Sequence, residues 1–298
     1  MWPVFNLEEQ YAEHPTIKRE EVQKLHQWLK AQPHLPDLLE QEALLFYYAC
    51  DHEMERAKHV IDKHYTFRTH AVDFFGNLDL ESPKLVQAQN TMASFPLNES
   101  TPKGYRVTIT KLTETDAAKY DFVDSLKLFF AAQDIWLHEV GLVPGIIIVI
   151  DLAGFSFRHL TRIGISHVKK ICRYAQEVVP VPLLEMHFVN PSSIVGKIMK
   201  LLKPLIKKES KNKVVVHSSL ESLHQHIPPC MLPQEYGGDE RSCAELAEIY
   251  YKKVRKYRLN IIEFNRSRHV DEKLRPSKNE SDLVTSKKTF DIVNYLRK

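Results

Sequence analysis

The 298-residue sequence lacks the short motifs that mark the common classes of enzyme. It contains no G-x-S-x-G, no G-x-x-x-x-G-K-[ST], no G-x-G-x-x-G and no H-E-x-x-H. These patterns build nucleophile elbows, phosphate-binding loops, dinucleotide-binding turns and zinc-protease helices. We therefore expect that the protein is not an enzyme and that it carries neither a metal nor a cofactor.

Cysteine and long apolar runs are also scarce. No C-x-x-C pair and no zinc-ligand spacing is formed by the four cysteines, Cys50, Cys172, Cys230 and Cys243. We expect them to be reduced thiols. The first ten residues show no signal-peptide pattern, and the longest apolar run, residues 142–150, is far shorter than the roughly 20 residues that span a bilayer. These features favour a cytoplasmic protein, peripheral to membranes.

Histidine is plentiful, with fifteen in the chain, but it has no matching pattern of other ligands. We interpret the four on the N-terminal helices as solvated surface residues: His52, His59, His64 and His70. Asp151 ends a β-branched apolar run, at a position where α/β folds often place functional residues. We interpret it as the turn-forming residue of the Asp-Leu-Ala-Gly sequence.

The positive charge is concentrated in one segment. The net charge is only +3, but residues 197–213 contain seven lysines and one glutamate. This segment therefore carries +6 and the rest of the chain −3. A local basic patch fits an anionic surface better than nucleic acid, although a solvated helix face is the default interpretation of any lysine run.

The same segment is amphipathic at the period of a helix. Between residues 194 and 206 the apolar side chains fall on one side and the lysines on the other, and Pro204 interrupts the pattern. Such a segment can cover an apolar cavity with one face and meet an anionic membrane with the other. It points to a lipid carrier.

The rest of the chain divides into a helical part and an α/β part. Residues 1–92 have helical periodicity, and residues 93–262 alternate strands at 105–112, 145–151, 185–189 and 213–217 with helices at 120–140, 160–178 and 241–264. This order predicts a mainly parallel sheet flanked by helices. Residues 263–298 are polar, and we expect a loosely held extension there.

Several segments in order resemble the CRAL-TRIO lipid-binding and transfer family, including its helical N-terminal subdomain. They are LPDLLEQEALLFYYACDHEMERAKHVIDKHYTFR, GIIIVIDLAGFSFRHL, HFVNPSSIV, KPLIKK, KVVVH and LPQEYGG. Within the family, DLAGFSFRHLTRI and HFVN are most similar to the branch of tocopherol-transfer and retinaldehyde-binding proteins, in an invertebrate-type form. The fold implied is a sheet floor beneath a gate helix.

The resemblance implies a lipid cavity with a floor, walls and a gate. The expected floor is Ile146, Ile148, Ile150, Phe155, Met186 and Phe188. The expected walls are Leu128, Ala132, Ile163, Ile171, Val179, Val181 and Leu183. The expected gate is Ile194, Ile198, Leu201, Leu202 and Ile206. Each of these residues is also compatible with an ordinary core role.

The resemblance also implies polar anchors and a membrane-binding patch. Ser125, Tyr174 and His187 are the candidates for a hydrogen bond to the ligand. The candidates for membrane or phosphoinositide contact are Lys197, Lys200, Lys203, Lys207, Lys208, Lys211 and Lys213. The basic pair expected before the HFVN segment is replaced by Pro182 and Leu184, which favours general anionic docking over a defined inositol-phosphate pocket.

Together these features predict a protein that binds and transfers one hydrophobic lipid. A tocopherol-, retinoid- or carotenoid-like molecule or a phospholipid would fit, with an anionic membrane as the other partner, no nucleic acid, and a monomeric chain. The alternative is a lipid-sensing module that reports its ligand state to a protein partner without bulk transfer.

Overall fold

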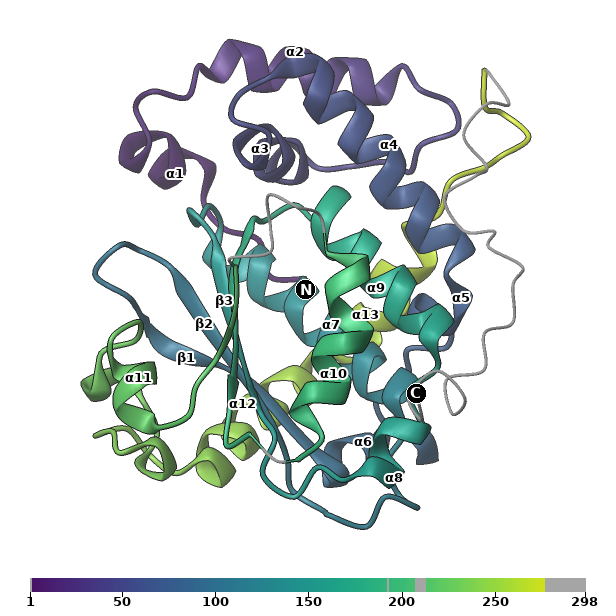
Figure 1. Ribbon diagram of the computed structural model, residues 1–298. Helices are drawn as coiled ribbons and strands as arrows, with labels where there is room; N and C mark the ends of the chain where they lie inside the picture. The colour runs from purple at the N-terminus through teal and green to yellow at the C-terminus, as the bar shows by residue number, and fades with distance from the viewer. Residues whose placement is uncertain (1, 192, 207–212, 277–298) are drawn as a thin grey trace.

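The computed structural model describes residues 2–191, 193–206 and 213–276. A twisted sheet lies at its centre, helices cover both faces of the sheet, and a group of N-terminal helices sits above one end (Figure 1). The predicted α/β class and the all-helical N-terminal region are confirmed.

In the described part of the chain, five strands form one sheet in the order β1–β2–β3–β4–β5. They are β1 (Met92–Ser100), β2 (Arg106–Leu112), β3 (Ile146–Asp151), β4 (Leu183–Val189) and β5 (Val214–Val216). The β1–β2 pair is antiparallel and the other three pairs are parallel. The prediction of a mainly parallel sheet is therefore correct.

The two faces of the sheet are distinguished by the alternation of side chains along β3. Ile148 pairs with Met186 and Ile150 with Phe188, so these four share the inner face. This face lies towards α7 (Phe122–Val140), α8 (Phe157–Thr161), α9 (Ile165–Glu177) and α10 (Val195–Leu202) (Figure 1). The outer face meets α11 (Leu220–His224), α12 (Cys243–Lys256) and the 3-10 turns η3 (Pro229–Met231) and η4 (Gln234–Tyr236).

The N-terminal helices form their own apolar core, which contains Leu25, Leu44 and Ile61. The helices of this core are α1 (Leu7–Glu13), α2 (Arg19–Lys30), α3 (Glu40–Ala49) and α4 (Met54–His70). The next two, α5 (Val72–Phe75) and α6 (Pro83–Thr91), pack elsewhere, α5 with residues of α7 and α9 and α6 in the core around the sheet. One prediction here is wrong: His64 is buried, and its Nδ1 lies 2.8 Å from the Val178 carbonyl. The helix period places His64 on the same face as Ile61, which an isolated histidine does not reveal.

Strand β1 was not among the predicted strands, and it has Pro96 in its middle. Proline lacks a backbone donor and is tolerated only on edge strands or at bulges. Both conditions hold here: β1 is the edge of the sheet, and its register with β2 shifts between Pro96 and Ser100.

The predicted C-terminal helix 241–264 is two helices, α12 and α13 (Arg258–Ser267), divided at Tyr257. The expected domain boundary at residue 263 therefore falls inside α13. Residues 265–276 are also not loosely held. Arg268 donates two hydrogen bonds of 2.9 Å to buried Glu42, and Val270 is buried in the N-terminal core. Residues 277–298 lie outside the described residues.

Candidate functional site

A cavity of about 280 Å³ lies between the inner face of the sheet and helices α7 to α10. Its lining is almost wholly apolar, and its few polar side chains lie on β1, β2, α7 and α9, before α7 and at the end of β3. An enclosure of this kind can hold a hydrophobic molecule, because apolar surface in contact with water is unfavourable by roughly 25 cal/mol per Å².

The floor of the cavity is the inner face of β3 and β4. All six residues expected there line it: Ile146, Ile148, Ile150, Phe155, Met186 and Phe188. The grouping of the five strand residues follows from the strand period of two, together with the parallel register of β3 and β4, and Phe155 joins them from the turn after β3.

The gate segment, residues 194–206, covers one side of the cavity. Ile198, Leu201 and Leu202 of α10 line it, and the first two are buried. The helix ends at Leu202, and Pro204 lies in the 3-10 turn η1 (Lys203–Leu205), which is where the sequence placed the interruption. Ile194 packs with the same apolar cluster without lining the cavity.

The predicted wall on α7 is rotated away from the cavity. Leu128 and Ala132 are buried in the core that contains residues of α6 and α12. Their neighbours line the cavity instead: Phe122, Ser125, Leu126, Phe129, Phe130 and Gln133. This set follows the 3.6-residue period from Ser125, and one residue of phase error turns a helix by about 100°.

The other expected walls divide between two cavities. Ile163, Ile171, Val179 and Leu183 line the apolar one. Val181 and Ile206 line a second cavity of about 460 Å³, between the α3–α4 connection, α9 and the start of β4. The two cavities share a boundary formed by Cys172, Ala175, Val179, Leu183, Met186 and Leu202.

The polar candidates do not all reach the cavity. Ser125 and Tyr174 line it, but the Ser125 hydroxyl already donates to the Asp121 carbonyl at 2.7 Å. His187 points from the outer face of the sheet, because it alternates with Met186 and Phe188 along β4. Gln133, which sequence reasoning missed, lines the cavity, and its amide has no hydrogen-bond partner among the described residues.

Asp151 has the structural role predicted for it. One carboxylate oxygen accepts hydrogen bonds from the Ala153 backbone at 2.8 Å and from the Asn190 amide at 2.9 Å. The other accepts from the Tyr236 hydroxyl. Its acceptor capacity is thus used to fix the turn after β3, the exit of β4 and the η4 turn.

The basic candidates have different surroundings. Lys200 and Lys203 are exposed beside the gate, whereas Lys197 lies over the Phe157 ring at 4.1 Å. Lys213 is exposed and donates to the Leu183 carbonyl at 3.3 Å. Lys207, Lys208 and Lys211 lie outside the described residues. No helix in the described ranges is long and apolar enough to cross a bilayer.

Comparisons with known proteins agree with this geometry. Residues 90–238 match the CRAL/TRIO domain family, and residues 14–85 match the family described as Pinta-like, UBA domain. The chain is 25% identical to Clavesin-1 of Xenopus laevis over 232 residues, which are 76% of this chain and 69% of that protein. It is 26% identical to the human Alpha-tocopherol transfer protein-like over 234 residues, 77% of this chain and 68% of that protein. The chain thus spans about two thirds of these relatives.

Among solved structures, the crystal structure of Sfh5 resembles this one with a TM-score of 0.51 and 15% identity. The likeness covers 83% of this chain and 99% of that one. It supports the fold alone.

Proposed function

Because this chain belongs to the CRAL/TRIO domain family, we propose that it binds one hydrophobic lipid and transfers it between anionic membranes. The observation that carries the proposal is the apolar cavity between the sheet and the gate segment. A lipid in that cavity contacts the floor isoleucines on one side and α10 on the other. The chain acts as a carrier and performs no chemistry on the lipid.

The two adjoining cavities indicate the shape of the cargo. Their volumes, about 280 and 460 Å³, are comparable to the roughly 300–1,000 Å³ of typical small-molecule pockets. The first is apolar, and the second adds charged side chains, Asp51, Arg56 and Lys213 among them. We expect the apolar part of a tocopherol-, retinoid- or carotenoid-like molecule or of a phospholipid to occupy the first cavity, and a long chain or polar head group to extend into the second.

Gln133 is the best-placed anchor for a ligand hydroxyl or carbonyl. Its amide can both donate and accept, and a polar group in an apolar cavity gains from a partner. The Ser125 hydroxyl uses its proton in the bond to the Asp121 carbonyl, but its oxygen can still accept a hydrogen bond from a ligand. These two side chains take the place of His187 in the ligand site.

Docking to the membrane is assigned to the lysines beside the gate. Lys200 and Lys203 are exposed at the end of α10, next to the residues that must leave the cavity when it opens. Lysines near an anionic leaflet contribute about 1 kcal/mol each. Attraction to the membrane therefore brings the gate to the place where apolar side chains can enter lipid.

The proposal is tested by native mass spectrometry of the full chain, followed by transfer of the lipid found between donor and acceptor vesicles. One lipid per chain, and transfer faster than the lipid's spontaneous exchange, are expected. A chain that purifies without lipid, takes up none from vesicles of cellular lipid composition and does not accelerate exchange would contradict the proposal.

A further inference from the structure

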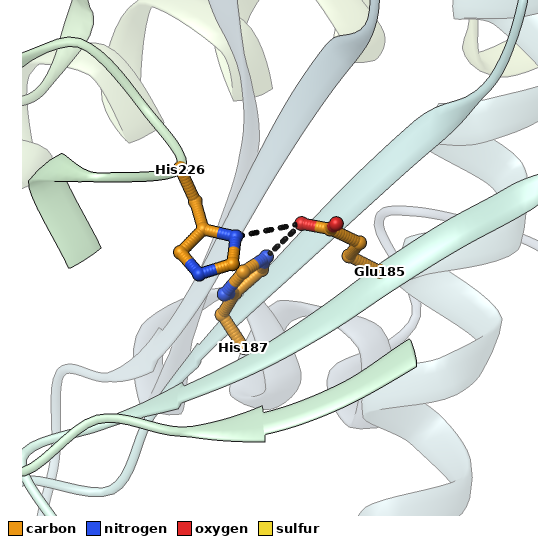
Figure 2. Close-up of side chains that lie close together, drawn as sticks. All are labelled: Glu185, His187 and His226. Carbon is orange, nitrogen blue, oxygen red and sulfur yellow. Dashed lines mark hydrogen bonds and ion pairs between the residues drawn. The ribbon is translucent and has the colours of Figure 1, made fainter. Parts of the chain in front are cut away.

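The outer face of the sheet, opposite the lipid cavity, carries a cluster of three histidines and one glutamate. Glu185 and His187 lie two residues apart on β4 and therefore on one face. His217 follows β5, and His226 follows α11. Figure 2 shows Glu185, His187 and His226 converging from β4 and from the segment after α11.

The three residues drawn in Figure 2 bring their donor atoms together. One oxygen of Glu185, Oε2, lies 2.8 Å from His187 Nε2 and 3.1 Å from His226 Nδ1. One ligand atom from each residue lies within 4.8 Å of the others. Among residues 2–191, 193–206 and 213–276, this is the one group of three such side chains close enough to share an ion.

A chain of hydrogen bonds through His217 to Ser222 fixes the orientation of the His187 ring. Its Nδ1 lies 2.7 Å from His217 Nε2, and His217 Nδ1 lies 2.8 Å from the Ser222 hydroxyl. When His187 Nδ1–H donates to His217, and His217 Nδ1–H donates to Ser222, the lone pair on His187 Nε2 faces Glu185 and His226. Metal-binding histidines are commonly oriented by such a hydrogen bond from the second ring nitrogen.

We propose that Glu185, His187 and His226 form a binding site for one divalent transition-metal ion of the zinc type. Two imidazoles and one carboxylate are a donor set that Zn²⁺ uses, with a fourth position left to water or another ligand. This site lies apart from the lipid cavity, and the proposal does not depend on lipid transfer.

The spacing of the donors suits a small tetrahedral ion. Zinc bonds to nitrogen and oxygen of about 2.0–2.2 Å place tetrahedral donors about 3.3–3.6 Å apart. The two separations from Glu185 Oε2 are 2.8 and 3.1 Å, so the donors must move outward by a few tenths of an ångström. His226 and Glu185 can make that movement, since their side chains are 33% and 36% exposed, whereas His187 is fully buried and stays in place.

A bound ion would join two segments 41 residues apart. β4 carries the cavity floor residues Met186 and Phe188 on its inner face, and His226 belongs to the segment that covers its outer face. The ion would therefore stabilise the folded chain, since a ligand that binds only the folded state raises its apparent stability.

The test is calorimetric titration of the full, chelator-treated chain with Zn²⁺, together with its thermal unfolding. We expect one tight site per chain and a higher Tm with Zn²⁺. His226→Gln and Glu185→Gln, both at partly exposed positions, should weaken Zn²⁺ binding at least tenfold and abolish the shift in Tm. Without added zinc, both variants should unfold close to wild type.

His70→Gln is the matched control, because His70 lies 2.9 Å from Glu272 but this pair has no third donor. A Cys230→Ser chain excludes binding by the exposed thiol. Both should bind Zn²⁺ like wild type. Absence of a tight site in wild type, or unchanged Zn²⁺ affinity in His226→Gln and Glu185→Gln, would overturn the proposal.

Discussion

The Tyr236 hydroxyl donates a hydrogen bond of 2.9 Å to Oδ2 of Asp151, 85 residues earlier in the chain. Both groups are buried. The bond fastens the η4 turn, on the outer face, to the end of β3, whose inner face forms the cavity floor. Asp151 stands at the end of a strand, where α/β folds often place functional residues, and the bond gives it a structural role there.

Tyr236→Phe removes this bond and leaves Asp151 with two other donors. Hydrogen bonds to charged groups contribute about 1.5–3 kcal/mol, so we expect the free energy of unfolding in urea to fall by about 2 kcal/mol. Lipid binding should be unchanged. Tyr257→Phe is the control, since its hydroxyl lies 3.5 Å from Glu139 in a partly exposed pair, and its loss should cost far less. Equal losses in the two variants would contradict this assignment.

Leu201→Asp and Ile198→Asp place a carboxylate against the apolar cavity. We expect each variant to lose its co-purified lipid, because an unpaired charge is strongly unfavourable in such surroundings. Lipid per chain is measured by mass spectrometry and folding by circular dichroism. Leu259→Asp is the control, since that side chain is 73% exposed. Folded Asp variants with a full complement of lipid would show that α10 does not cover the ligand.

Gly196→Ala and Pro204→Ala test the gate as a moving part. A methyl group at Gly196 would meet no atom within 4 Å, and replacing glycine within a helix stabilises it by about 0.5–1 kcal/mol. Pro204→Ala restores a backbone donor in η1. Both should slow transfer between vesicles and leave equilibrium binding nearly unchanged. If transfer rates stay at the wild-type value, the hinge lies elsewhere, with Asn190 as the next candidate because its φ is +50°.

Neutralising Lys200, Lys203, Lys207 and Lys208 to Gln should weaken binding to anionic vesicles by several kcal/mol in total, at about 1 kcal/mol each. Raising the salt concentration should have the same effect, since the Debye length is only about 8 Å at physiological ionic strength. Vesicle sedimentation measures both. Lys252→Gln with Lys256→Gln, exposed on α12, is the control. Binding that resists both treatments would indicate apolar insertion instead.

His64 makes stability depend on pH. Burial, with a smaller effect of Arg68, lowers its pKa to about 3 in the folded protein. The unfolded chain takes up a proton near pH 6.5, so the contribution of neutral His64 is complete above that pH and declines as the pH falls, by about 1.4 kcal/mol per unit.

His64→Asn keeps an amide donor for the Val178 carbonyl but cannot titrate. Between pH 7 and 5, the drop in unfolding free energy should be about 2 kcal/mol smaller in this variant than in wild type. Exposed His70→Gln serves as the control. A variant with the same pH dependence as wild type would assign the effect to other buried histidines.

The floor and gate could be predicted from the sequence because each depends on one local period. Alternation along β3 and β4 places Ile148 and Phe188 on a common face, and the spacing of α10 separates Leu201 from Lys200. The side of α7 that faces the cavity could not be predicted in this way. Apolar residues surround much of that helix, which is buried by the sheet on one side and by α6 and α12 on others, so Leu128 and Phe129 are indistinguishable by hydropathy.

Contacts between distant segments escaped prediction for a different reason. Neither the position of Gln133 in the cavity lining nor the meeting of His187 with His226 is encoded in any sequence spacing, since the two histidines are 39 positions apart with a strand between them. The metal-ligand cluster becomes visible only once β4, β5 and the segment after α11 lie side by side.

The ion pair between Arg268 and Glu42 has a consequence for synthesis on the ribosome. Glu42 is buried in the N-terminal core, and the guanidinium that neutralises it is made 226 residues later. Until then, helices α2 to α4 must either keep that carboxylate in water or bury it with hydrogen bonds from the Tyr65 hydroxyl and the Leu39 backbone N–H but without the guanidinium. The first helices to emerge are therefore among the last to settle, and the nascent chain reaches its native N-terminal packing only after α13 has left the exit tunnel.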